Sequence, residues 1–136
     1  MIRVQNCEFH LETKNTAYLF DTTPTGHLRH LHYGAKVLSA DDKALSVKNT
    51  IQLGSSVHVA PGECLDDLLL DYSGIGRGDY RHTPLECRMP DGSFVADFVY
   101  DYFTVEETPV TIPGLPSATG KGETLSVWLK DPKFPV

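Results

Sequence analysis

Apolar and polar residues alternate along several short stretches of the chain, most regularly from Ser93 to Tyr102. One face of that stretch would carry only apolar side chains, namely Phe94, Ala96, Phe98 and Tyr100. A period of two residues is typical of a half-buried strand. The tripeptide Pro90-Asp91-Gly92 is a strong turn signal, so the sequence predicts a hairpin between strands at residues 85–89 and 93–102.

Shorter patterns predict further strands at residues 2–11, 15–20, 27–33, 104–110 and 124–130. The breaker series from Asp21 to Gly26 predicts a hairpin turn between two of them, and Ile112 to Pro116 turns the chain before the last. In that last strand we expect Trp128 to lie in the core with its apolar neighbours Leu125, Val127 and Leu129.

Many short strands separated by turn signals about every 8 to 12 residues are typical of a β-sandwich. The stretch from Leu65 to Leu70 fits a strand or one helical turn, so we expect an all-β fold with antiparallel sheets and at most one short helical turn. A length of 136 residues predicts a single domain over residues 1–136. The connection from Ser39 to Glu63 is long, with one strand expected near Ser56 to Val59.

Composition narrows the class of partner. The chain has 12 basic and 18 acidic residues without charged blocks, which argues against a surface for nucleic acid or anionic membrane. No stretch approaches the roughly 20 apolar residues of a membrane helix, and the opening residues lack the apolar core of a signal peptide. The three cysteines have no C-x-x-C spacing, so we expect free thiols in a reducing cytoplasm.

The most distinctive stretch is a glycine-rich bend that leads into a charged triplet. Gly74, Gly76 and Gly78 permit positive φ and a sharp turn. If the triplet is extended, Asp79 and Arg81 point to one face with Tyr80 on the other. A carboxylate beside a guanidinium suggests polar recognition, and the alternative is a salt bridge that fixes the bend. These two residues are the candidates for substrate binding.

Three histidines are the second candidate group. His30 and His32 would share one face of a strand, which is a feasible pair of metal ligands, with His27 nearby. No third ligand follows at a recognisable spacing, so we expect no metal or other cofactor and histidines that face solvent.

Other motifs predict no chemistry. The glycines lack the helix N-terminus of a phosphate loop, the Arg77-Gly78-Asp79 tripeptide occurs by chance, and no serine or cysteine lies in a nucleophile elbow. Neighbouring carboxylates suit general acid and base catalysis. Asp66 and Asp67 are adjacent and so point apart, and with Asp71 they favour a solvated turn. We therefore predict no catalytic residue.

The chain resembles the amino-terminal β domain of bacterial α-galactosidases of glycoside hydrolase family 36. The resemblance begins with residues 2–11 and 25–34 and continues in order along almost the whole chain. Its later motifs are Leu65-Asp66-x-Leu68 with Tyr72, Gly78-Asp79-Tyr80-Arg81-x-x-Pro84, Asp91-Gly92-Ser93 and Asp97-Phe98.

This resemblance implies that the chain is one part of a retaining enzyme that removes terminal galactose from raffinose and melibiose. Such enzymes combine a β-supersandwich, a (β/α)₈ barrel that carries both catalytic aspartates, and a carboxy-terminal β domain. We therefore expect a fragment that is inactive without the barrel of the same polypeptide. The resemblance further implies a homotetramer in which the loop matching residues 41–63 reaches a neighbouring active site and its galacto-oligosaccharide. Between Lys43 and Ala60 this loop is short of the arginine and acidic residues of those relatives, so no individual sugar-contacting residue is carried over to it.

Two alternatives remain from the residues alone. A stand-alone carbohydrate-binding β-sandwich would present exposed aromatic rings, for which Tyr80, Tyr100, Tyr102 and Trp128 are available. An assembly module would instead expose an apolar patch or an unpaired sheet edge.

Overall fold

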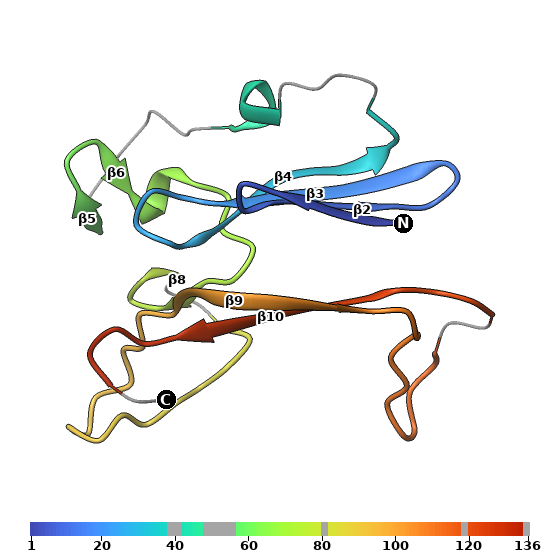
Figure 1. Cartoon of the computed structure of the whole chain (residues 1–136). Helices are drawn as coiled ribbons and strands as arrows, with labels where there is room; N and C mark the ends of the chain where they lie inside the picture. Colours follow the sequence, from blue (N-terminus) through green and yellow to red (C-terminus); the bar gives the residue numbers. More distant parts are fainter. Residues whose placement is uncertain (38–41, 48–56, 80–81, 118–119, 135–136) are drawn as a thin grey trace.

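Two layers of antiparallel strands form the molecule (Figure 1). The computed structural model describes the chain except residues 38–41, 48–56, 80–81, 118–119 and 135–136. A four-stranded sheet in the order β1-β2-β3-β4 faces a two-stranded sheet of β9 and β10. Within the described residues, no helix is long and apolar enough to cross a bilayer. The expected all-β sandwich is confirmed, and its sheets are antiparallel apart from one short parallel pair formed by Gly74–Ile75 and Gly78–Asp79.

The first sheet consists of β1 (Ile2–Gln5), β2 (Glu8–Glu12), β3 (Thr16–Thr22) and β4 (Leu28–Ala35), each antiparallel to the next. The expectation of one extended segment over residues 2–11 was wrong. Asn6 and Cys7 have φ values of 50° and 60° and form a tight turn that pairs β1 with β2. Positive φ at both central residues suits a two-residue hairpin, but the Asn-Cys pair lacks the glycine that usually signals one.

The second sheet is a hairpin of β9 (Val99–Glu106) and β10 (Thr124–Lys130), with a bulge between Trp128 and Leu129. The strand expected at residues 124–130 is therefore confirmed. The turn at residues 90–92 is also present, because the Gly92 N–H donates to the Met89 carbonyl at 2.9 Å. Its flanks at residues 85–89 and 93–98 are not strands, contrary to the prediction.

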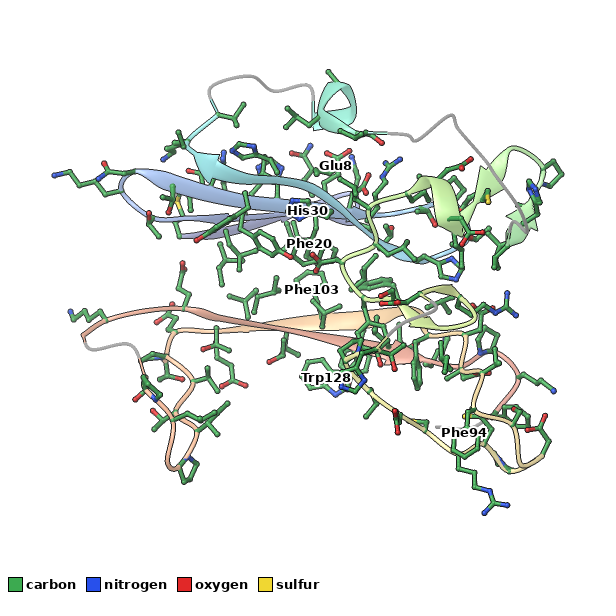
Figure 2. All side chains as sticks on the ribbon, turned by 180° about the vertical axis from the view of Figure 1, so that it is seen from behind. Glu8, Phe20, His30, Phe94, Phe103 and Trp128 are labelled. Atoms are coloured by element: carbon green, nitrogen blue, oxygen red, sulfur yellow. The ribbon has the colours of Figure 1, made fainter. Side chains whose placement is uncertain are left out.

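The main core lies between the two layers. Phe9 and Phe20 of the first sheet are buried, and their rings stack with centroids 4.6 Å apart. Phe103 of β9 meets the Phe9 ring edge-on at 5.6 Å, and Figure 2 shows Phe20 and Phe103 facing each other between the sheets. The half-buried residues that pack against this core from β9 and β10 are Tyr100, Leu125, Val127 and Leu129.

Trp128 does not belong to this core, contrary to the prediction. Its side chain is 40% exposed and lies on the outer side of β10 (Figure 2). The reason is the period of two residues, because Val127 and Leu129 use the inward positions and Trp128 lies between them.

Short elements complete the structure. At most one short helical turn was expected, but two 3₁₀ turns are present, η1 (Asp42–Leu45) and η2 (Leu65–Asp67). The short strands are β5 (His58–Ala60), β6 (Glu63–Cys64), β7 (Gly74–Ile75) and β8 (Gly78–Asp79), and β5 contains part of the strand expected near residues 56–59.

Both expectations for residues 65–70 are partly met. After η2 the chain becomes extended and runs along the free edge of β4, where Leu70 forms a bridge with Arg29. The His30 N–H donates to the Leu69 carbonyl at 2.7 Å, and the Asp71 N–H donates to the Leu28 carbonyl at 3.0 Å. This pairing brings the glycine-rich bend beside β4.

Candidate functional site

The glycine-rich bend forms as the sequence predicted. Gly76 and Gly78 have φ values of 68° and 87°, a conformation that favours glycine. The Arg77 N–H donates to the Gly74 carbonyl at 3.0 Å, and the Gly76 N–H donates to the Asp79 carbonyl at 2.9 Å. The bend therefore closes on itself and delivers Asp79 at its end.

Asp79 lines a hollow of about 390 Å³ beside β4. The Ser73 hydroxyl donates to Asp79 Oδ2 at 3.2 Å, which fixes the carboxylate against the chain that enters the bend. Tyr80 and Arg81 lie outside the described residues, so the expected pairing of Asp79 with Arg81 stays a prediction. The hollow is lined by His30, Leu68, Leu69, Leu70, Asp71, Ser73, Gly78 and Asp79.

Asp71 is the second carboxylate of this hollow. It accepts a hydrogen bond from the Tyr18 hydroxyl, and its Oδ1 lies 3.7 Å from His30 Nδ1. Burial and the hydrogen bond to Asp71 raise the pKa of Tyr18 well above its ordinary value. The Tyr18 and His30 rings also lie in contact, with centroids 5.6 Å apart. Strand β3 thus holds the Asp71 side of the hollow in place.

The lining of the hollow suits a neutral polar ligand better than an anion. Its described residues include two carboxylates, a hydroxyl and an imidazole, and neither lysine nor arginine is among them. Carboxylates and hydroxyls accept and donate the hydrogen bonds that sugar hydroxyls make. No phenylalanine, tyrosine or tryptophan lies among these residues to stack on a sugar face.

Asp66 and Asp67 do not join this hollow. Asp66 Oδ2 accepts a hydrogen bond from the Val57 N–H at 2.8 Å, and Asp67 is buried. The expectation of a solvated turn was therefore wrong for Asp67, because η2 turns it inward.

His27 is buried at the centre of a polar network, contrary to the expectation of solvent-facing histidines. Its Nδ1 lies 2.8 Å from the Thr25 hydroxyl, which also donates to Glu63. Its Nε2 lies 3.0 Å from Asp97 Oδ1, and Arg77 Nη2 lies 3.5 Å from the other carboxylate oxygen. The hydrogen bond from His27 lowers the pKa of Asp97, although burial opposes that effect.

Little in the sequence marks this network. Residues 25, 63, 77 and 97 belong to four separate segments, so only the tertiary structure brings them to His27. The one available hint was the position of His27 directly after a turn series and before an apolar strand residue.

His30 and His32 point to opposite faces of β4, which contradicts the shared face that the sequence predicted. His30 contacts the ring of Tyr18, whereas His32 pairs across the sheet with Leu19, the next residue of β3. An irregularity in the β3–β4 register places Leu31 between them as an extra residue. Across the described part of the chain, no three histidine, cysteine or acidic side chains lie close enough to hold a metal ion.

The two layers and the site together define the class of the protein, which is a β-sandwich domain with a polar hollow at a glycine-rich bend. The family model of the glycosyl hydrolase family 36 N-terminal domain matches residues 26–136. The chain belongs to this family.

Individual relatives agree with the family. The bifunctional alpha-galactosidase/sucrose kinase AgaSK of Mediterraneibacter gnavus is 29% identical over 128 residues, which cover 90% of this chain and 14% of the relative. Alpha-galactosidase AgaA of Geobacillus stearothermophilus is 25% identical over 134 residues, which cover 93% of this chain and 18% of the relative. The chain therefore spans less than a fifth of these relatives.

Solved structures show the same architecture. The galactosidase domain of AgaSK superposes with a TM-score of 0.79 at 27% identity, covering 98% of this chain and 20% of that one. AgaA bound to 1-deoxygalactonojirimycin superposes with a TM-score of 0.74 at 25% identity, covering 91% of this chain and 18% of that one.

Proposed function

We propose that residues 1–136 form a non-catalytic amino-terminal domain of a larger α-galactosidase, whose catalytic barrel belongs to the same polypeptide. The observation that carries this proposal is that the matches cover nearly all of this chain but only a small part of each relative. Nearly all of this chain superposes on the galactosidase domain of AgaSK, yet it covers only 20% of that domain. The complete enzyme would hydrolyse terminal α-linked galactose from oligosaccharides of the raffinose and melibiose type.

The hydrogen bonds made by the carboxylates support a non-catalytic role. A retaining glycosidase needs two carboxyl groups about 5 to 5.5 Å apart across a bound sugar, one as nucleophile and one as general acid and base. Here Asp71 accepts from Tyr18, Asp79 from Ser73, and Asp97 is held by His27. These hydrogen bonds tie the two carboxylates of the hollow, and Asp97 outside it, to the fold.

The test is an activity and binding comparison. Galactose and raffinose are titrated into the 136-residue chain, and hydrolysis of a chromogenic α-galactoside is measured under the same conditions. The proposal predicts neither binding nor turnover by this chain, and turnover by the longer polypeptide that contains it. Turnover by the 136 residues alone would contradict it. Binding without turnover would favour the alternative, a stand-alone carbohydrate-binding β-sandwich.

For Asp79 and Arg81 we propose a role in shaping the domain and its contacts, with sugar contact as the secondary role. Asp79 lines the hollow and is anchored by Ser73, which supports this assignment for one of the two. The variants Asp79→Ala and Arg81→Ala are expected to reduce folding or assembly of the longer polypeptide. Normal folding and assembly in both variants would contradict this role.

We also propose that the full-length enzyme is a cytoplasmic homotetramer that binds a galacto-oligosaccharide. The free state of Cys7, Cys64 and Cys87 agrees with a reducing compartment. A variant of AgaA from Geobacillus stearothermophilus has been solved in complex with raffinose, which supports the substrate class. Light scattering of the longer polypeptide measures the mass, and cell fractionation gives the location.

A further inference from the structure

The buried ring of His27 lies in the middle of a chain of three hydrogen bonds that runs between two carboxylates. His27 Nε2 lies 3.0 Å from Asp97 Oδ1, and His27 Nδ1 lies 2.8 Å from the Thr25 hydroxyl. The Thr25 hydroxyl donates in turn to Glu63 of β6. The Thr23 hydroxyl accepts from the His27 backbone N–H and can donate to Thr25, which lies 3.1 Å away. The chain therefore connects the segment that enters β9 with β6.

Three hydrogen bonds need three hydrogens, and the neutral side chains supply only two. An ionised carboxylate accepts without donating, the threonine hydroxyl has one hydrogen, and a neutral imidazole has one N–H. The chain is therefore complete only when it holds one extra proton. Histidine binds a proton more readily than a carboxylate does, so His27 carries it and donates from both ring nitrogens. The hydrogen bond from His27 is also the largest cause that lowers the pKa of Asp97, which agrees with an ionised acceptor there.

Other charged groups surround this chain of hydrogen bonds. Arg77 Nη2 lies 3.5 Å from the second carboxylate oxygen of Asp97, and Asp131 Oδ2 accepts from the Asp97 backbone N–H at 2.8 Å. Arg29 of β4 lines the same hollow as Glu63. Arginine and aspartate side chains do not ordinarily change charge between pH 5 and 8, whereas histidine does. The charge of this network therefore changes at the ring when the pH crosses that range.

The Glu63 end of the chain holds the β5–β6 hairpin. This hairpin lies at the same end of the first sheet as the turn before β4 (Figure 1). A hollow of about 270 Å³ lies between residues 60–64 of the hairpin and Thr23, Pro24 and Arg29 of the sheet and its turn. The hydrogen bond from Thr25 to Glu63 thus fastens a segment that is not closely packed on the sheet.

We propose that His27 is a pH-sensitive switch that fastens the β5–β6 hairpin to the first sheet only while the ring carries its extra proton. Loss of this proton breaks one ring N–H bond and passes the proton to water. Two acceptor atoms then face each other at one point of the chain, and they must move apart. Asp97 is fixed by Arg77 and by Asp131, whereas the hairpin borders a hollow. Glu63 and the hairpin are therefore the end that moves away.

The test is hydrogen–deuterium exchange, followed by mass spectrometry, in the longer polypeptide that contains this chain. Exchange of residues 57–65 is compared at about pH 5.5 and about pH 8, after correction for the intrinsic pH dependence of amide exchange. We expect these residues to exchange roughly tenfold faster at the higher pH, as the loss of one hydrogen bond to a charged group predicts. His27→Gln has no titrating ring and should exchange equally at both pH values. Equal exchange in the unmodified protein, or an undiminished pH difference in this variant, would overturn the proposal.

Two further positions test the switch without changing the buried ring. Thr25→Val removes the hydroxyl of a half-buried residue, so exchange should be fast at both pH values, whereas Thr25→Ser keeps the hydroxyl and the pH dependence. His58 of β5 is exposed, and His58→Gln should also keep the pH dependence. A pH dependence that Thr25→Val leaves intact, or that His58→Gln abolishes, would assign the effect to another group and contradict the switch. Amide exchange is measured without substrate, so failure of this proposal leaves the proposed function intact.

Discussion

His27 and Asp97 are 70 residues apart in the sequence, and their side chains meet at 3.0 Å between Nε2 and Oδ1. The contact joins the turn before β4 to the segment that enters β9. The Asp97 N–H is held in turn by Asp131 Oδ2 at 2.8 Å, beyond the end of β10. One buried histidine thus links the two layers of the sandwich at the end that carries the glycine bend.

The first prediction concerns this histidine. Replacing His27 by alanine removes one hydrogen-bond partner from Asp97 and one from Thr25 at a buried position, so we expect a loss of about 1–3 kcal/mol of unfolding free energy. The control is His32→Ala. His32 Nε2 meets the Ala35 carbonyl in an exposed hydrogen bond, so this variant should change stability by less than about 0.5 kcal/mol. Urea denaturation of the two variants measures the difference, and equal effects would contradict the role assigned to the network.

The second prediction compares two glycines with ordinary φ. A Cβ at Gly74 would lie 2.9 Å from the backbone oxygen of Ala96, which cannot rotate away. Gly74→Ala should therefore cost about 1–3 kcal/mol, as overpacking does. A Cβ at Gly122 meets only Pro109 Cβ at an ordinary 3.6 Å, so Gly122→Ala should be neutral or stabilising by about 0.4–1 kcal/mol. Thermal unfolding of the two variants checks this, and a neutral Gly74→Ala would mean that the bend does not pack on Ala96.

The third prediction is acid sensitivity at the turn of residues 90–92. Hydrogen bonds from Ser93 and then from Lys133 lower the pKa of Asp91 from 3.8 to about 2. Because the folded pKa lies below the unfolded one, this group stabilises the fold above pH 3.8 and loses that effect as the pH falls toward about 2. Carboxyl NMR shifts give the pKa directly. Ser93→Ala removes the largest cause and should raise it, and an unchanged value would contradict the assignment.

The fourth prediction is alkaline sensitivity at Tyr18. Burial and the hydrogen bond to Asp71 raise its pKa above 10.0, so it stays neutral in the folded chain when the unfolded chain has begun to ionise. The stability that this group contributes is present below pH 10 and is lost as the pH rises. Tyr18→Phe removes the titrating group, so unfolding should depend less steeply on pH in this range. An equally steep dependence in the variant would show that another group is responsible.

The sequence predicted the fold class because the alternation of apolar and polar residues and the turn residues are local features that determine it. The last strand and the bend at Gly76 and Gly78 follow from residues that are neighbours in the sequence. The same alternation also held the information that places Trp128 outside, since its neighbours Val127 and Leu129 are apolar. Large aromatic residues are usually buried, but here the outward position of Trp128 in the strand determines that its ring is exposed.

Other features depend on partners that sequence spacing does not show. The extra residue Leu31 in the β3–β4 register separates His30 from His32, and no local pattern marks it. The hollow likewise forms only where β4, the stretch after η2 and the glycine bend meet. Asp79 could be selected from its sequence motif, but the sequence does not show that Asp71 lies beside it.

The separation of the two layers along the chain has a consequence for synthesis. The sheet β1–β4 is complete at Ala35, and its hairpins can form as soon as they leave the ribosome because their contacts are local. The hairpin that covers Phe9 and Phe20 ends only at Lys130. During the interval the apolar face of the finished sheet is exposed to water, so we expect chaperones to bind the nascent chain before it leaves the ribosome.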